Sequence, residues 1–186
     1  MRTLYIMTTG GTIEKEYSEP TGNLENKARK IDRYLQQLRL PGCDLRTIPL
    51  MNLDSLNMVD ADRALILASV KEVLKHRAPI VITHGTDTLI KTGIFLKKSL
   101  PDLSYPIVMT GAMTPLGFEG SDGLQNLTES IFALQFLPRG VYVVMHGQTF
   151  PIDRVRKESR LSRFVPTEKS TTRRDQEAGS RADIKH

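Results

Sequence analysis

Two threonine-containing segments hold the residues best suited to covalent chemistry. The first, residues 8–14 (TTGGTIE), places the hydroxyl of Thr12 directly after two glycines. Glycine lets the backbone turn sharply and lets a ligand approach closely. Thr12 is therefore a candidate nucleophile, with neighbouring amides free to hold an oxyanion. A glycine turn beside a threonine of no chemical role is the alternative. The segment has the spacing of neither a dinucleotide fingerprint nor a phosphate-binding P-loop.

The second segment, residues 84–88 (HGTDT), lies between an apolar run and a predicted helix. Amides at a helix start favour an anion such as a carboxylate. Asp87 could cap this helix or bind a substrate ammonium. Thr86 is a second candidate nucleophile and needs a base, for which a lysine with a lowered pKa could serve. His84 has the chemistry of a base too, but a single histidine at a strand end is more often structural.

A third polar position, Ser55, follows another predicted strand. Its hydroxyl could bind a substrate carboxylate or merely cap a turn. Metal chemistry finds little support, because the four histidines are scattered along the chain and no zinc-binding spacing occurs. No metal and no cofactor are expected.

The elements that must position these residues alternate along the chain. Five apolar runs rich in strand-forming residues predict strands at 3–8, 45–50, 79–83, 106–110 and 140–145. Helical spacing of apolar residues predicts helices at 26–38, 61–76 (capped by Asp60), 87–100 and 122–137. The polar stretch 12–25, which contains a proline and a glycine, is expected to be a loop.

This alternation predicts an α/β fold, a doubly wound, mostly parallel sheet covered by helices on both faces. The polar segments 8–12, 83–88 and 110–114 then follow the carboxyl ends of strands. Ligands of such sheets bind in crevices outside those ends. Three segments far apart in the chain are thus expected to meet at one edge of the sheet.

The positive charge is unevenly distributed. The chain has 186 residues and a net charge of +5, but residues 1–153 hold 16 basic and 16 acidic residues. The whole excess lies in residues 154–186, with ten basic and five acidic residues. We expect one catalytic domain over residues 1–165 and a disordered basic tail over 166–186, which has too few apolar side chains to pack. Without interleaved aromatic residues, that tail does not predict specific nucleic-acid binding.

Cysteine content and hydropathy indicate the cellular compartment in which the protein is expected. Cys43 is the single cysteine, so an intramolecular disulfide is excluded. No apolar run reaches the roughly 20 residues that span a bilayer, and the first residues do not resemble a secretory signal. We expect a cytoplasmic protein that does not bind membranes.

Taken together, the motifs resemble those of the L-asparaginase family of amidohydrolases. The pieces, in order, are TTGGTIE (8–14), DSLNM (54–58), THGTDTL (83–89), MTGAM (109–113), SDGLQNL (121–127) and VYVVM followed by DRVRK (153–157). Two threonine motifs in the right strand context, roughly 75 residues apart, make the resemblance specific. It covers about residues 3–165, similar to the larger N-terminal domain of that family.

The resemblance implies cleavage of a side-chain amide, that of asparagine in preference to glutamine, with release of ammonia. Thr12 would form the acyl-enzyme, Tyr17 would belong to the loop that closes over the site, and Lys157 would raise the basicity of Thr86. The implied catalytic set is Thr12, Tyr17, Thr86, Asp87 and Lys157, and the implied substrate-binding set is Gly11, Ser55, Thr86, Asp87 and Ala112. Ser55 would bind the α-carboxylate, Asp87 the α-ammonium, and backbone near Ala112 the amide.

The chain also departs from the family pattern, and other functions remain possible. Family members carry a smaller C-terminal domain that lends an acidic residue to a neighbouring subunit's site, and no residue here is assigned that role. Leu56 stands where several relatives have a polar residue, and Tyr17 follows Thr12 closely. The family assembles as dimers and tetramers, so a homo-oligomer is expected. The alternatives are an ammonia-supplying component of a transfer-RNA-dependent amidotransferase and a non-catalytic amino-acid-binding or regulatory module.

Overall fold

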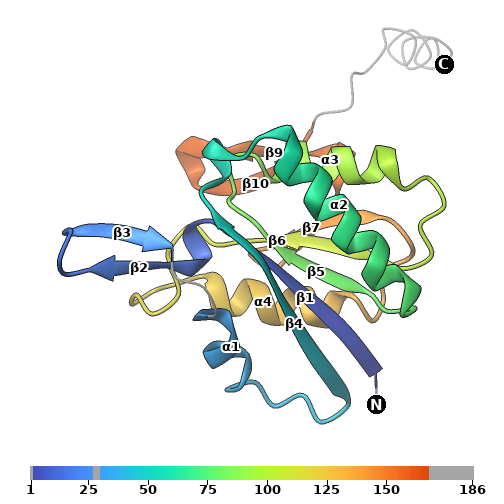
Figure 1. Cartoon of the computed structure of the whole chain (residues 1–186), viewed down its shortest axis with the longest axis horizontal. Coiled ribbons are helices and arrows are strands. Elements are labelled where there is room, and N and C mark those ends of the chain that lie inside the picture. The colour runs from blue at the N-terminus through green and yellow to red at the C-terminus, as the bar shows by residue number, and fades with distance from the viewer. Residues whose placement is uncertain (1, 27–29, 168–186) are drawn as a thin grey trace, which may run out of the picture.

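A six-stranded sheet forms the centre of the computed structural model, which describes residues 2–26 and 30–167 (Figure 1). Its order is β4-β1-β5-β6-β7-β8. Neighbouring strands run parallel from β4 to β7, and β8 pairs antiparallel with β7. The strands are β1 (Arg2–Gly10), β4 (Cys43–Leu53), β5 (Ile80–Thr83), β6 (Ile107–Thr110), β7 (Val141–Met145) and β8 (Gln148–Pro151).

Helices cover both faces of this sheet. In Figure 1, α2 (Asp60–Lys75) and α3 (Leu89–Ser99) lie on one side, and α1 (Lys30–Leu35) and α4 (Gly123–Ala133) lie on the other. Successive strand residues alternate between the two apolar cores. In β5, Ile80 and Ile82 pack with α2 and α3, while Val81 packs with α1 and α4. The α/β fold with a mostly parallel, doubly covered sheet is therefore confirmed.

The predicted strands are all present, and the helices differ mainly at their ends. The first helix is shorter than expected, because residues 23–26 are a strand and α1 begins at Lys30. Asp60 was expected to cap α2 but is its first residue. The cap position is Val59, whose amide donates to the Asp62 carboxylate at 2.8 Å. Asp62, in the first turn, therefore accepts from the amide of the cap residue, which is one half of a capping box.

Short polar strands were missed. The stretch expected to be a loop contains the antiparallel hairpin of β2 (Lys15–Ser18) and β3 (Asn23–Asn26), which projects from the body in Figure 1. A second hairpin, β9 (Val155–Glu158) with β10 (Arg163–Pro166), follows the sheet. Residues 166–186 were expected to form a disordered tail. All of these residues beyond Thr167 lie outside the part of the chain that the structure describes. Within the described part, no helix has the length and hydropathy needed to cross a membrane.

Candidate active site

The turn that carries Thr12 is built from two glycines at the end of β1, both with positive φ. Gly10 and Gly11 have φ of 94° and 82°, and Gly11 combines this with ψ of −175°, a region essentially restricted to glycine. A Cβ on Gly11 would lie 2.5 Å from the Cα of Gly85. The two threonine motifs therefore touch through their glycines. Thr12 begins a short 3₁₀ turn (Thr12–Glu14) and is partly exposed, and no hydrogen bond of its hydroxyl is found among the described residues.

The second motif is tied to a lysine from the end of the domain. Lys157, on β9, places Nζ 2.7 Å from the hydroxyl of Thr86 and 2.7 Å from Oδ1 of Asp87. Thr86 is buried, whereas the carboxylate of Asp87 is about half exposed. Lys157 keeps only 19% of its side chain exposed. The structure thus brings three of the candidate catalytic residues into direct contact across 70 residues of sequence.

The Ser55 hydroxyl is buried beside the second motif without a partner. Its Oγ has no hydrogen-bond partner among the described residues. A Cβ on Gly85 would come within 2.5 Å of this oxygen, so Ser55 lies directly against the HGTDT turn. The hydroxyl of Thr88 donates to the Ser55 carbonyl at 2.9 Å and fixes the segment. An unsatisfied buried hydroxyl is costly unless a ligand pairs with it, which suits a position that binds substrate.

An ion pair joins the Ser55 segment to the residues after Thr12. Lys15 Nζ lies 2.8 Å from Oδ2 of Asp54, whose Oδ1 accepts from the amide of Leu56 at 3.1 Å. The hydrogen bond from Lys15 and then that from Leu56 hold the pKa of the Asp54 carboxyl below its usual value. Leu56 itself is largely exposed. Asp54 therefore caps the turn that presents Ser55 and anchors the start of β2.

Backbone near Ala112 is held by a network that sequence reasoning missed. The Ala112 side chain packs in the core shared with α4, and the preceding Gly111 lies against the second threonine motif, where an added Cβ would be 3.3 Å from Cγ2 of Thr86. Asp122 accepts from the amides of Met113 (3.0 Å) and Thr114 (2.9 Å) and from Nε2 of His146 (2.7 Å). Burial alone would raise the pKa of Asp122, but these hydrogen bonds outweigh it and hold the pKa below the usual value. The four-residue spacing of Asp122 and Asn126 in SDGLQNL was the available signal, since Asn126 donates to the Gly111 carbonyl.

His84 is a structural residue in this arrangement. It is fully buried, and burial lowers its pKa to about 4. Nδ1 lies 2.8 Å from the Gly85 carbonyl, which can only accept, so Nδ1 carries the proton. Nε2 is then left to accept from the hydroxyl of Thr92 at 2.9 Å. Because both ring nitrogens are hydrogen-bonded within the protein, His84 stabilises the turn of the second motif.

Tyr17 stands apart from the other candidates. It lies on the projecting β2–β3 hairpin, is 55% exposed, and makes no hydrogen bond with Thr12. Its side chain lines a cavity of about 310 Å³ with Glu16, Lys30, Arg33, Leu116, Gly117 and Phe118. The structure therefore places Tyr17 on a cavity that neither Thr12 nor the Lys157 cluster lines.

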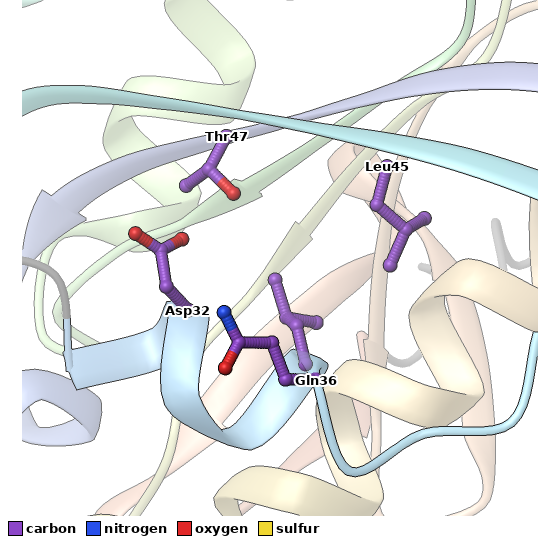
Figure 2. Close-up of a pocket in the computed structure, with 5 residues that line it drawn as sticks. Asp32, Gln36, Leu45 and Thr47 are labelled. Carbon is purple, nitrogen blue, oxygen red and sulfur yellow. The ribbon is translucent and has the colours of Figure 1, made fainter.

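A larger cavity lies elsewhere. Figure 2 shows it between α1 and β4, with Asp32 and Gln36 facing Leu45 and Thr47, and its volume is about 360 Å³. None of the candidate site residues lines it. Across residues 2–26 and 30–167, no group of three or more His, Cys, Asp or Glu side chains is placed to hold a metal ion.

Comparison with known proteins agrees with this geometry. Residues 3–165 match the family model described as the N-terminal domain of asparaginase. The L-asparaginase of Thermococcus kodakarensis is 33% identical over 155 residues, which are 83% of this chain and 47% of that protein. A glutamyl-tRNA(Gln) amidotransferase subunit from Methanococcus vannielii is 30% identical, over 80% of this chain and 35% of that protein.

Solved structures give the same answer. The thermostable L-asparaginase of Thermococcus kodakarensis superposes with a TM-score of 0.80 at 30% identity, covering 88% of this chain and 51% of that one. A probable cytoplasmic L-asparaginase of Campylobacter jejuni has a TM-score of 0.73 at 27% identity, over 84% of this chain and 50% of that one. The chain spans about half or less of the length of these relatives. With two threonine motifs in contact through their glycines, a lysine bonded to the second motif and a matching N-terminal domain, this chain belongs to the asparaginase family.

Proposed function

We propose that this protein hydrolyses the side-chain amide of L-asparagine to L-aspartate and ammonia, with weaker or no action on glutamine. The observation that carries the proposal is the contact of Lys157 with both Thr86 and Asp87 at 2.7 Å. A structural role alone would not require a lysine to join a buried threonine and a half-exposed carboxylate at the edge where Thr12 and Ser55 also lie.

Substrate binding follows from charge and hydrogen-bonding capacity. The exposed oxygen of Asp87 suits the α-ammonium of an amino acid, and the unpartnered hydroxyl of Ser55 suits its α-carboxylate. In this arrangement the substrate's side-chain amide would lie between the Gly11 turn and the backbone at Ala112. The scheme assigns no step to a metal or cofactor.

Catalysis proceeds through two acyl transfers. Thr12 Oγ attacks the amide carbon, the carbon–nitrogen bond breaks, and nitrogen leaves as ammonia with the proton taken from Thr12. Water then attacks the resulting ester, and Thr12 Oγ leaves and recovers a proton. Lys157 donates a hydrogen bond to Thr86 in the structure. Through the same contact, a neutral Lys157 would accept the proton of Thr86, and Thr86 would then take a proton from the attacking water.

Ammonia release from asparagine tests the proposal. The parent protein is expected to release ammonia from asparagine, while Thr12→Ala and Lys157→Met are expected to lose at least about a hundredfold in kcat, the usual effect of removing a nucleophile or a positioned proton acceptor. Lys97→Met is a matched control, because Lys97 pairs with Asp153 outside the site. Turnover that survives in both Thr12→Ala and Lys157→Met would contradict the mechanism.

The similarity to an amidotransferase component supports a second candidate, the supply of ammonia to a partner enzyme. That candidate shares the same chemistry but predicts faster turnover when the partner enzyme is present. A non-catalytic amino-acid-binding module predicts instead that calorimetry detects asparagine binding while the parent releases no ammonia. We place the protein in the cytoplasm as a homo-oligomer, and light scattering after size-exclusion chromatography measures that assembly.

A further inference from the structure

One buried carboxyl close to Thr12 has no part in the proposed reaction. Glu14 is 1% exposed, and its Oε2 accepts from the amide of Gly10 at 3.1 Å. Its own amide donates to the carbonyl of Gly11, also at 3.1 Å. Glu14 is therefore hydrogen-bonded to both glycines that precede Thr12, to Gly10 through its side chain and to Gly11 through its backbone amide. Thr12 lies inside the loop that these two hydrogen bonds close.

The surroundings of Glu14 favour neither protonation state strongly at neutral pH. The pKa of Glu14 is raised to about 7, mainly by burial and in part by the nearby Asp32, while hydrogen bonds from the Gly10 amide and the Thr8 side chain and the charge of Lys30 lower it. Both charged neighbours come from α1, which packs on this side of the sheet. The second oxygen, Oε1, is buried without a hydrogen-bond partner among the described residues. A proton taken up by Glu14 would sit on this oxygen and leave Oε2 facing Gly10.

We propose that Glu14 is a positioning residue for Thr12, whose carboxylate holds the Gly10–Gly11 turn in place and whose protonation loosens that hold. The proposal rests on the proposed function. A hydrogen bond to a charged acceptor is roughly twice as strong as one to a neutral acceptor, so the ionised carboxylate fixes the turn more firmly. Glu14 itself touches no substrate and acts through the backbone of residues 10–12.

The pH dependence of ammonia release from asparagine separates this role from a merely structural one. Glu14→Gln keeps an oxygen for the Gly10 amide but cannot ionise. In the parent, kcat is expected to fall about tenfold as the pH drops through about 7, the change expected on losing a charge-assisted hydrogen bond. In Glu14→Gln, kcat is expected to remain at the lower value without this inflection, while KM changes less than kcat. The exposed Glu119, replaced by Gln, is the matched control and should keep the parent profile.

A spectroscopic titration keeps the inference testable if the protein releases no ammonia. The amide signals of Gly10 and Thr12 in ¹⁵N–¹H spectra should shift together with an inflection near pH 7 in the parent and stay flat in Glu14→Gln. If the parent releases no ammonia, the proposed function is contradicted. If its Gly10 and Thr12 amide signals still shift with pH, the coupling of Glu14 to the turn is supported. Flat amide signals in the parent, or a parent-like kcat profile in Glu14→Gln, would overturn the proposal. The parent titration needs no variant, so poor folding of Glu14→Gln cannot obscure the result.

Discussion

At the scale of single residues, Ser55 shows how an unused hydrogen-bonding group indicates a ligand. Its buried Oγ has no partner among the described residues, so the free protein gains nothing from the hydroxyl. We expect Ser55→Ala to raise KM for asparagine about 10- to 100-fold, because a hydrogen bond to a charged group contributes roughly 1.5–3 kcal/mol. The change in kcat should be smaller, and the melting temperature should stay the same or rise, because Ser55→Ala removes a buried hydroxyl that has no partner among the described residues. Steady-state kinetics measures KM and kcat, and calorimetry measures the melting temperature.

Ser130 offers the matched contrast, since it is equally buried but its hydroxyl donates to the Asn126 carbonyl at 2.7 Å. Ser130→Ala should lower the free energy of unfolding by about 1 kcal/mol and leave KM unchanged. A Ser55→Ala variant that loses stability like Ser130→Ala but keeps the parent KM would mean that Ser55 only supports the turn.

The same scale shows what sequence reasoning could and could not reach. Thr12, Ser55, Thr86 and Asp87 were identifiable because each closely follows an apolar strand. Lys157 was not, because its partners lie about 70 residues away and only the family resemblance pointed to it. Asp122 lies in the SDGLQNL segment, but its role was missed because it acts on the backbone amides of Met113 and Thr114, and His146 was missed because it acts through Asp122.

At the scale of elements, the sequence predicted those that bury apolar surface and missed those that do not. The run in β5 is buried throughout, so its composition alone indicated a strand. The β2–β3 hairpin is mostly polar, and its one cross-strand apolar pair, Tyr17 opposite Leu24, is exposed rather than buried in a core. The site combines both kinds of element, with the glycine turns at the ends of buried strands and Tyr17 on the exposed hairpin.

The contact between the two glycine turns yields a prediction at this scale. Gly11→Ala would force a side chain into a conformation that only glycine adopts readily and would place its Cβ 2.5 Å from the Cα and the amide nitrogen of Gly85. The turns must then separate, so we expect ammonia release to fall at least about tenfold, the size of loss that small misplacements in a site produce. The free energy of unfolding should fall by more than about 1 kcal/mol.

Gly22→Ala is the control for backbone strain alone. Gly22 has φ of 67° in the hairpin turn, and a Cβ there would meet nothing within 4 Å. This variant should lose about 1 kcal/mol of stability from the left-handed conformation and keep its kcat. Equal loss of ammonia release in the two variants would show that strain, rather than the fit between the two motifs, sets activity.

At the scale of the whole molecule, two buried titratable groups act on stability in opposite directions. Glu14 has a folded pKa of about 7 against an ordinary value of 4.5, so the folded state binds the extra proton between these values. Its contribution to stability is full below pH 4.5 and is lost as the pH rises toward 7. His84 has a folded pKa of about 4 against 6.5, so its contribution is full above pH 6.5 and is lost as the pH falls toward 4. Each shift corresponds to about 3 kcal/mol at roughly 1.36 kcal/mol per pKa unit.

These opposing slopes should nearly cancel between pH 4.5 and 6.5, so the parent's free energy of unfolding should change little from these two groups across that range. Glu14→Gln removes one slope. Its stability should therefore rise with pH from 4.5 to 6.5 by up to about 3 kcal/mol, driven by the remaining burial of neutral His84. Urea denaturation of the parent, Glu14→Gln and the exposed control Glu119→Gln at several pH values measures the difference. A Glu14→Gln curve parallel to that of the parent would show that Glu14 has an ordinary pKa in the folded protein, and the acid inflection proposed for Thr12 would then need another origin.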